Sequence, residues 1–483
     1  MWLHWHRRDL RASDDRGLAA AADDGPVLPV FVLDPDVLEH AAPPRVAFLL
    51  DALDALGASY RERGSDLLVA RGDPAELLPA IADAHGAESV VYDYDYSGLA
   101  GERDERVRET LDDGGIDHEG HHDAVHHEPG TITTNDGDPY SVFTHFGKKW
   151  LDREKADPYP APGADTLVDA DAMADAGKSE AAPTGADGAL PTLDDLGFEE
   201  PEGAIPEAGT EAARDRLESF CEGDIYRYGE RRDYPAEECT SRLSVDLKYG
   251  TIGIREVSAR VAEAMDDADG EAERESVEAF QLQLAWREFY THVLYYNPGV
   301  VAENFKQYEN PIDWRDSADE LGAWKAGETG YPIVDAGMRQ LRAESYMHNR
   351  VRMIVASFLT KDLLADWRVG YDWFREKLVD HDTGNDNGGW QWAASTGTDA
   401  QPYFRIFNPM TQGADYDPDA EYITEYVPEL RGVDPERIHG WHELGSEERE
   451  AVAPAYPAPI VEHAERRERA LAMFERARGE SDG

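Results

Sequence analysis

Four side chains that can bind a flat ligand recur at three- and four-residue spacing in FQLQLAWREFYTHVLYYNP, residues 280–298. If this segment is a helix, Gln283, Trp286, Arg287 and Tyr290 share one face. The two rings can stack on a planar group, while the amide and the guanidinium can hydrogen-bond its edge. An ordinary core helix with an arginine reaching to solvent would have the same pattern, so this segment alone leaves both interpretations open.

A second segment, TSRLS at residues 240–244, places hydroxyl side chains beside an arginine. At the start of a helix, free backbone N–H groups and the positive end of the helix dipole would suit a phosphate. A plain N-cap is the commoner use of such residues, so this indication is weak by itself.

The most distinctive stretch is NDNGGWQWAASTGTDAQPYFRIFNP, residues 385–409. Two glycines precede Trp390 and Trp392, which predicts a tight turn beneath two large rings. Surface loops rarely contain so many large aromatic side chains, so we expect this stretch to contribute to a functional site.

Histidines are concentrated in HEGHHDAVHHEPG, residues 118–130. Histidine pairs three to five residues apart can bind zinc. No cysteine lies nearby and the spacing is irregular, so we predict no metal site.

The N-terminal part alternates strand and helix patterns. Residues 27–34, 66–73 and 89–95 read as buried strands, and residues 45–64 as an amphipathic helix. This alternation predicts a mostly parallel sheet covered on both faces. Neither G-x-G-x-x-G nor a P-loop occurs, so neither standard phosphate-binding fingerprint marks this domain.

Three regions follow from the change of pattern along the chain. We predict an α/β domain over residues 1–130, an interdomain linker over 131–210 and an all-α domain over 211–483. The linker prediction depends mainly on residues 152–210, which are rich in Pro, Ala, Gly and Asp and have little periodicity.

The charge is extreme for a protein of this length. The 483 residues include 47 Lys and Arg, mostly Arg, against 100 Asp and Glu, which gives a net charge of −53. The acidity is spread along the chain, which is typical of a halophile whose cytoplasm screens charge strongly. The only cysteines, Cys221 and Cys239, favour a reducing, cytoplasmic setting. No apolar run reaches the roughly 18 residues of a membrane span, so we expect no membrane association.

Several longer motifs together resemble the photolyase/cryptochrome family over nearly the whole chain, and microbial photolyases of haloarchaeal type that act on cyclobutane pyrimidine dimers in particular. In order they are HRRDLR (6–11), DPYSVFTHFGKKW (138–150), YGERRDYPAEECTSRLS (228–244), LAWREFY (284–290), TGYPIVDAGMRQL (329–341), MHNRVRM (347–353) and NGGWQWAASTGTDAQPYFRIFNP (387–409).

The resemblance implies a Rossmann-like α/β antenna domain and an all-α domain that binds FAD. It implies light-driven electron transfer from reduced FAD to a pyrimidine dimer that is flipped out of UV-damaged DNA. Because the dimer pairs poorly with the opposite strand, flipping it out costs less free energy than flipping out an intact base. Trp390, Trp367 and Trp314 match a tryptophan chain that carries electrons from the surface to FAD. The positions matching FAD contacts are Tyr228, Thr240, Ser241, Arg242, Leu243, Ser244, Arg287, Asn349, Arg352, Asp380, His381 and Asp382.

For DNA, the resemblance places Trp286 and Tyr346 in the pocket of the flipped-out dimer. Contacts to the DNA are implied for Arg232, Tyr290, Tyr346, Arg350, Met353, Arg405 and Gln412. The net charge opposes DNA binding, so we expect a monomer with one local basic patch. Its members would be Arg231, Arg232, Arg339, Arg342, Arg350, Arg352, Arg405, Lys148 and Lys149.

Two catalytic positions depart from the family pattern. Gln283 stands where many dimer photolyases have Glu, and relatives acting on (6-4) photoproducts also have Gln there. Asp386 stands where photolyases have Asn near flavin N5, whereas plant-type cryptochromes have Asp. Tyr346 replaces the usual pocket Trp. The alternatives are therefore (6-4) repair or a cryptochrome-type blue-light receptor.

The second chromophore is also open. LKYGTIGI (247–254) resembles the type that binds 8-hydroxy-5-deazaflavin, with Lys248 at the matching position. We favour this chromophore over methenyltetrahydrofolate, although an exposed lysine at a helix end is the commoner fate of such a residue.

Overall fold

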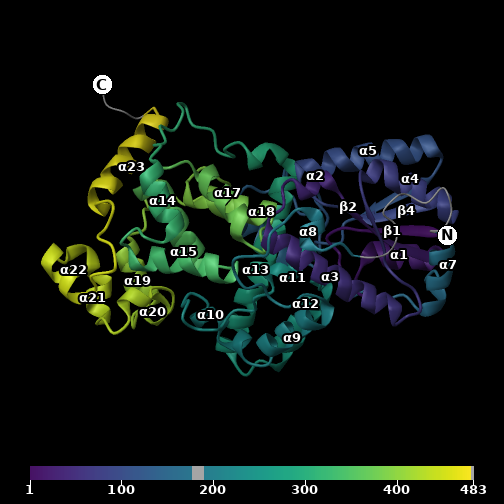
Figure 1. Cartoon of the computed structure of the whole chain (residues 1–483), viewed down its shortest axis with the longest axis horizontal. Helices are drawn as coiled ribbons and strands as arrows, with labels where there is room; N and C mark the ends of the chain where they lie inside the picture. The colour runs from purple at the N-terminus through teal and green to yellow at the C-terminus, as the bar shows by residue number, and fades with distance from the viewer. Residues whose placement is uncertain (177–189, 480–483) are drawn as a thin grey trace. The chain divides into compact units, whose positions relative to one another are not determined.

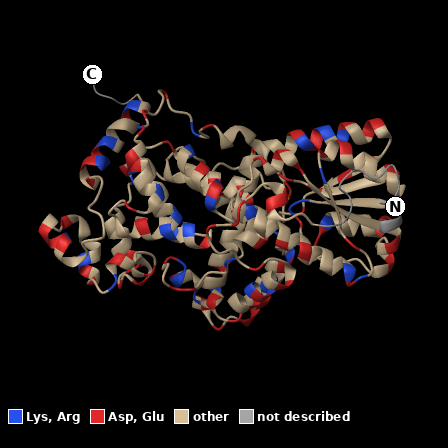
Figure 2. Cartoon of the chain, viewed as in Figure 1, with Lys and Arg blue, Asp and Glu red and all other residues tan. Residues whose placement is uncertain are grey.

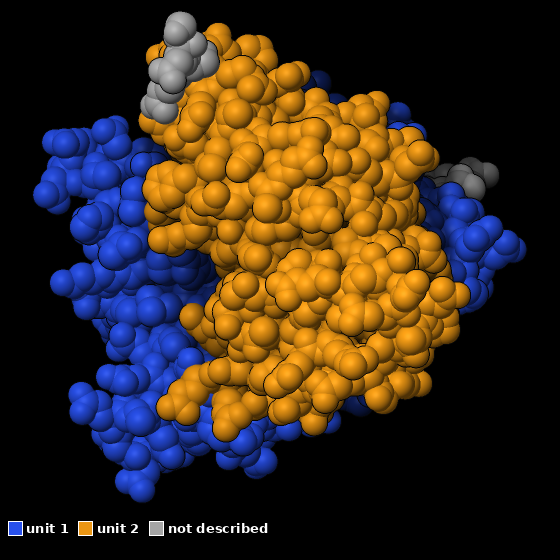
Figure 3. All heavy atoms as spheres, turned by 90° about the vertical axis from the view of Figure 1, so that its left-hand side faces the viewer, with its two compact units in different colours: residues 1–201, 206–229, 240–298 blue, residues 202–205, 230–239, 299–483 orange. Residues whose placement is uncertain are grey.

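The structure, a computed structural model, describes residues 1–176 and 190–479. They divide into two compact units. Unit 1 comprises residues 1–201, 206–229 and 240–298 (blue in Figure 3), and unit 2 comprises residues 202–205, 230–239 and 299–483 (orange). The predicted boundaries at residues 130 and 210 do not coincide with these limits, and the three-region division stays a prediction.

Unit 1 contains a five-stranded parallel sheet with the strand order β3-β2-β1-β4-β5. Strands β1, β2 and β4 are labelled in Figure 1. The strands are β1 (Trp2–His6), β2 (Val27–Leu33), β3 (Leu68–Arg71), β4 (Ser89–Asp93) and β5 (Asp117–His121). Central β1 pairs with both β2 and β4, with Trp2 opposite Val27 on one side and Ser89 on the other. The predicted parallel sheet is confirmed, although β1 and β5 were not recognised.

Side-chain alternation along β1 gives the sheet two different faces. Leu3 and Trp5 pack into a hydrophobic core with Leu78 of α4 (Pro74–His85) and Val107 of α5 (Gly98–Gly114). The alternate positions, His4 and His6, lie on the opposite face. That face is covered by α1 (Arg16–Asp24) and α3 (Pro43–Arg61).

The loops that join strand to helix carry clear capping signals. Asp73 caps α4 by accepting a hydrogen bond from Ala75 N at 3.0 Å, and Pro74 stands at the first helical position. The helix ends at Gly86, whose φ of 69° lies in the left-handed region that favours glycine. These signals were present in the sequence, although α4 was not among the elements predicted from it.

Unit 1 also contains helices from the region predicted as the all-α domain. They are α9 (Thr210–Cys221), α11 (Ser244–Tyr249), α12 (Ile254–Asp267) and α13 (Glu271–Tyr296). The predicted linker contains α6 (Phe143–Asp152), α7 (Ala170–Ala176) and α8 (Leu193–Leu196), and α13 packs against α6. Residues 177–189 of this linker lie outside the described residues.

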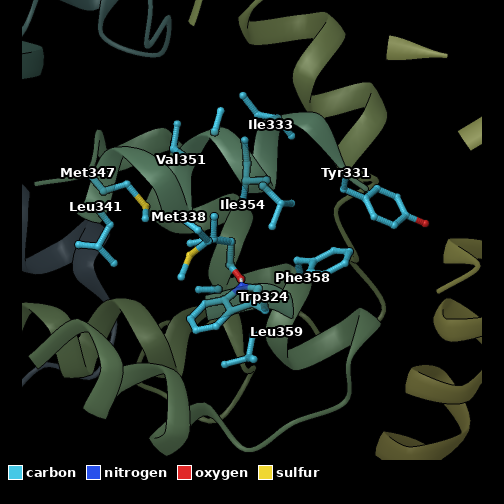
Figure 4. Close-up of a cluster of buried hydrophobic side chains, with 14 of the residues drawn as sticks. Trp324, Tyr331, Ile333, Met338, Leu341, Met347, Val351, Ile354, Phe358 and Leu359 are labelled. Carbon is cyan, nitrogen blue, oxygen red and sulfur yellow. Dashed lines mark hydrogen bonds between the residues drawn. The ribbon is translucent and has the colours of Figure 1, made fainter. Parts of the chain in front are cut away.

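The regular secondary structure of unit 2 is entirely helical among its described residues, as predicted. Its longer helices are α14 (Ala318–Ala326), α15 (Pro332–Glu344), α16 (Asn349–Ser357), α17 (Trp367–Lys377), α18 (Thr383–Ala393), α19 (Pro409–Tyr416) and α23 (His463–Ala477). Figure 4 shows part of its core, where Trp324 lies among Met338, Ile354 and Leu359. None of the described helices is long and apolar enough to cross a membrane.

A buried carboxylate on α15 organises the neighbouring loops. Asp335 is fully buried and accepts hydrogen bonds from Thr329 N (2.7 Å), Thr329 Oγ1 (2.6 Å), Gly330 N (3.0 Å) and Tyr456 OH (2.5 Å). Gly330 has a φ of 73°, and a Cβ there would lie 2.4 Å from the backbone of Ala458. This carboxylate therefore joins two loops that approach each other too closely for a side chain.

We expect Asp335→Asn to destabilise the protein by about 2–4 kcal/mol, because the new NH₂ group would face hydrogen-bond donors that then lack an acceptor. The shift is measured as the midpoint of urea unfolding in molar KCl. Asp319→Asn, an exposed change in the first turn of α14, is the control. Equal midpoints for the two variants would contradict this role of Asp335.

Candidate functional site

The predicted face of α13 exists and is partly accessible. Gln283, Trp286, Arg287 and Tyr290 are all half-buried. The indole of Trp286 stacks on Phe143 of α6, with ring centroids 3.7 Å apart and planes 11° apart. The ring centroids of Tyr290 and Trp286 are 5.5 Å apart. Together the three rings form an aromatic platform. Phe143 was not predicted as a site residue, although it lies in the motif at 138–150.

The polar members of this face have different roles. Arg287 donates to Ala124 O at 2.7 Å and to Leu247 O at 2.9 Å, so it ties α13 to the loop after β5 and to α11. Gln283 donates to Ala279 O of its own helix at 3.2 Å. Because the amide lies one turn from Trp286, it can offer an edge contact to a ring stacked on the platform.

The opposite side of α13 is anchored by a buried carboxyl group. Glu288 is 1% exposed and accepts hydrogen bonds from the backbone N–H groups of His126 (2.8 Å) and His127 (3.0 Å). Burial raises the pKa of Glu288 to about 7, and the two backbone donors only partly oppose this. The histidine segment therefore holds α13 in place through its backbone.

The segment 240–244 precedes α11, which begins at Ser244. Leu243 is buried, Thr240 and Ser241 are half-buried, and Arg242 and Ser244 are exposed. Arg242 has a φ of 50°, in the left-handed region. Hydroxyl and guanidinium groups suit the phosphates of a dinucleotide. Because α11 has only six residues, its dipole contributes little.

Tyr228 lies in unit 1 with α9 and α13. Its ring is buried and meets Phe220 and Phe280 edge-on, with centroids 5.7 and 5.4 Å away. The next residue, Gly229, donates its N–H to Ser276 Oγ of α13 at 2.8 Å. Tyr228 is thus positioned by aromatic packing.

In unit 2, the segment before α18 and the helix α16 bring charged groups together. Arg352 forms a two-pronged ion pair with Asp380, at 2.7 and 3.0 Å, and donates to Met347 O at 2.7 Å. Asp386 lies 3.6 Å from Arg352, and its Oδ2 is 2.6 Å from His381 Nδ1. The pairing of Asp386 with His381 and Arg352 could not be read from the sequence.

The donor set of unit 2 matches the polar groups of a flavin. Carboxylates such as those of Asp380 and Asp382 can accept hydrogen bonds from ribityl hydroxyls, while an amide such as that of Asn349 and a guanidinium such as that of Arg352 can pair with the donor and acceptor edge of the ring. Asp382 also caps α18 by accepting from Asn385 N at 2.9 Å. The residues present therefore fit FAD chemically.

The three tryptophans of the predicted electron chain belong to one hydrophobic cluster of unit 2. Trp390 and Trp367 are buried, and Trp314 is partly buried at the edge of the cluster. The ring of Trp390 lies against Gly370 of α17, where a Cβ would come within 2.1 Å of it. Trp367 begins the same helix and donates its Nε1–H to Asn304 Oδ1 at 2.9 Å.

Among the predicted DNA contacts of unit 2, Arg350 is already paired. Its guanidinium lies 2.8 Å from Asp233 and 4.2 Å from the ring centre of Tyr416. The guanidinium carbon of Arg352 lies 5.5 Å from the ring centre of Tyr346. Arg405 is exposed, whereas Arg232, Met353 and Gln412 are half-buried.

The predicted basic patch is largely neutralised by acidic partners. Arg231 pairs with Glu237 at 2.5 Å, Arg339 with Glu429 at 2.7 Å, and Arg342 with Glu202 at 2.9 Å, in addition to the pairs of Arg350 and Arg352. In the ribbon of Figure 2 the positions of acidic residues (red) occur along most helices, with those of basic residues (blue) among them. Most of these arginines must therefore exchange a carboxylate for a phosphate to contact DNA.

Comparisons with known proteins cover both halves of the chain. Residues 2–163 match the family model described as DNA photolyase, and residues 280–476 match the FAD binding domain of DNA photolyase. The chain is 64% identical to the deoxyribodipyrimidine photo-lyase of Halobacterium salinarum, over 99% of this chain and 100% of the relative.

Two solved structures are similar over nearly their whole length. One is a bacterial class III photolyase from Agrobacterium tumefaciens, with a TM-score of 0.88, 34% identity and coverage of 99% of this chain and 98% of the other. The other is a cryptochrome from Synechocystis, with a TM-score of 0.87, 26% identity and coverage of 98% and 99%.

The anchor of α13 predicts a pH dependence. The pKa of Glu288 lies near 4.5 in the unfolded chain and about 7 in the fold, so unfolding releases a proton between these pH values. The contribution of Glu288 to stability is therefore fully present below pH 4.5 and is lost as the pH rises to about 7. Glu288→Gln cannot ionise, so its stability relative to wild type should increase over this window by up to about 3 kcal/mol. Urea unfolding at several pH values in constant KCl measures this, and parallel profiles for the two proteins would disprove it.

Proposed function

The chain belongs to the DNA photolyase family, and on that premise we propose that it repairs cyclobutane pyrimidine dimers in DNA in a light-dependent reaction. The geometry that supports this best is the half-buried Trp286, stacked on Phe143 with Gln283 one turn away. An extruded pyrimidine dimer needs such an apolar platform with a polar edge. The name of the Halobacterium relative, which spans the whole chain, agrees with this choice.

FAD is the cofactor, as the match of residues 280–476 to an FAD-binding domain supports. Reduced FAD, when bound, supplies an electron on illumination that opens the cyclobutane ring and is then returned. In unit 2, we assign Asn349, Arg352, Asp380, His381 and Asp382 to FAD binding. In unit 1, we assign the same role to Tyr228, Arg287 and the segment Thr240, Ser241, Arg242, Leu243 and Ser244.

The remaining residues have distinct proposed roles. Trp286 and Tyr290 would stack against DNA bases, and Gln283 would hydrogen-bond the edge of the dimer. Trp314, Trp367 and Trp390 would pass an electron inward from the surface during photoreduction. Contacts to the damaged strand are assigned to Arg232, Tyr346, Arg350, Met353, Arg405 and Gln412.

For the antenna chromophore we propose 8-hydroxy-5-deazaflavin rather than methenyltetrahydrofolate. Lys248 lies in a segment that packs against the loop after β1, where Leu10 N donates to Tyr249 O at 3.1 Å and Arg8 Nε donates to Lys248 O at 3.1 Å. This loop lies at the carboxyl end of β1, beside β4, where the strand order reverses. Doubly wound sheets bind their ligands at that position.

Asp386 and the similarity to a cryptochrome structure favour a second function, blue-light reception without repair. The carboxylate of Asp386 is shared between His381 and Arg352, so a role as proton donor to a flavin would compete with these two partners. This competition makes repair the preferred function.

The first experiment is repair of a defined thymine dimer in an oligonucleotide by the reduced holoprotein in molar KCl. We expect restoration of thymine under blue light and none in the dark. Added 8-hydroxy-5-deazaflavin should extend the action spectrum to its own absorption band, whereas added folate should not. Trp286→Ala should weaken binding of the damaged DNA roughly tenfold or more, because a stacking surface is lost.

Tyr295→Ala is the matched control, because it removes an exposed ring from the same helix. No repair of the dimer by protein that holds reduced FAD would overturn the proposal. Repair of (6-4) lesions instead would identify Gln283 as a determinant of lesion type, and repair of neither lesion would favour the receptor.

The ion pair of Arg350 yields a prediction about affinity. Asp233→Asn removes a carboxylate that competes with DNA phosphate, so binding of damaged DNA should tighten several-fold in fluorescence anisotropy titrations. Asp419→Asn makes the same charge change at an exposed position and should have a smaller effect. Equal gains for both variants would mean that net charge alone controls the affinity.

A further inference from the structure

A buried cluster of imidazoles and carboxylates lies at the carboxyl end of β1, beside the loop assigned to the antenna chromophore and apart from the residues assigned to FAD and DNA. His4 and His6 lie on one face of β1, Asp9 follows in the loop, and Asp15 is the residue before α1. Their exposed fractions are 0%, 0%, 1% and 2%. One nitrogen or oxygen atom of each lies within 4.8 Å of the corresponding atom of every other.

The spacing of these atoms suits a small metal ion. Asp15 Oδ2 lies 3.1 Å from His4 Nε2 and 3.8 Å from His6 Nδ1. The Asp9 carboxylate lies 3.5 Å from His4 Nε2 and 3.7 Å from His6 Nδ1. Four ligands bound tetrahedrally at about 2.0–2.1 Å from an ion lie roughly 3.3–3.4 Å from one another, close to these values.

Hydrogen bonds do not account for the whole cluster. Neither carboxylate oxygen of Asp93, at the end of β4, has a hydrogen-bond partner among the described residues, although Asp93 is only 6% exposed. Asp9 Oδ2 is likewise buried without a hydrogen-bond partner there. Oxygen atoms of Asp15, Asp93 and Asp123 also lie within 4.8 Å of one another. Buried carboxylates in such proximity require a cation or a proton between them.

Nearby arginines balance only part of this charge. The described carboxylates at this edge are Asp9, Asp14, Asp15, Asp93 and Asp123, and the guanidiniums that reach them are those of Arg11 and Arg255. With both histidines neutral, as metal ligands are, five carboxylates against two guanidiniums leave an excess of three negative charges. In the metal-free protein a proton on His4, whose pKa despite burial is raised to about 10 by Asp15 and Asp9, offsets one of them. A divalent cation would remove most of this excess.

His6 is oriented for such a role by a residue outside the cluster. Its Nε2 lies 2.7 Å from Tyr60 OH of α3, and its Nδ1 faces the carboxylates of Asp9 and Asp15 at 3.7 and 3.8 Å. Nδ1 also lies 3.0 Å from the backbone O of Asp9, a contact that a bound ion would replace. Metal-binding histidines usually have their second ring nitrogen held by a hydrogen bond, as Nε2 is here.

We propose that the four side chains of His4, His6, Asp9 and Asp15 bind a divalent first-row transition-metal ion, with Zn²⁺ as the best match to two nitrogen and two oxygen ligands in a closed, buried site. The ion cross-links β1, the loop after it and the start of α1. Its role is structural, because the closed set of ligands leaves no position for a substrate. Sequence spacing predicted no metal site, since these ligands are brought together by strand alternation and a tight loop.

The test is the metal content of the full-length protein after incubation with Zn²⁺ and dialysis in molar KCl, measured by mass spectrometry. We expect about one equivalent retained, and a thermal unfolding temperature that falls by several degrees with a chelator and recovers with Zn²⁺. Co²⁺ in place of Zn²⁺ should produce the visible absorption of a tetrahedral site.

His6→Gln should lose the bound ion, whereas the control His118→Gln, which changes a histidine outside the cluster, should retain it. Circular dichroism establishes that both variants are folded. Wild-type protein that retains no zinc and whose unfolding temperature does not respond to the chelator would overturn the proposal, as would retention by folded His6→Gln. Loss of the ion from His118→Gln alone would equally overturn it, by placing the ion at the protein surface.

Discussion

The arrangement of unit 1 depends on two arginines that are buried with their carboxylate partners. Arg11 and Arg255 both pair with Asp123, and Arg255 also pairs with Asp14 at 2.5 Å. These pairs join the loop after β1, the loop after β5 and the start of α12, segments that are far apart in the sequence. A buried charge whose partner is removed is costly, so these ion pairs specify how the helices join the sheet.

Close backbone approaches accompany this network. A Cβ on Gly250 would lie 2.0 Å from Arg8 O, and one on Gly253 would lie 1.9 Å from Asp14 Oδ2. The chain can therefore bring α11 and α12 against the edge of the sheet only where side chains are absent. The glycines of the segment at 247–254 therefore meet a steric requirement, and the close packing places Lys248 beside the loop after β1.

The acidic composition of the chain is reflected in the way its arginines are paired. Arginines in both units are paired with carboxylates rather than left to form an open basic surface, as Arg214 with Glu256 in unit 1 and Arg350 with Asp233 in unit 2 show. High salt weakens such exposed pairs and also weakens contacts to phosphate. Binding of damaged DNA in such a medium would therefore depend strongly on stacking and shape, which salt affects little.

The sequence by itself determined the parallel sheet, the helical C-terminal part and the face of α13, because hydrophobic periodicity and helix spacing are local properties. The predicted tight turn before Trp390 and Trp392 was wrong, because Gly388 and Gly389 lie inside the helix α18 together with both tryptophans. Only the tertiary structure decided that Phe143 lies under Trp286 and that Asp386 is shared between His381 and Arg352. Only the tertiary structure also showed that His4, His6, Asp9 and Asp15 lie together. Such contacts join residues whose separation along the chain has no regular period, so the sequence pattern does not predict them.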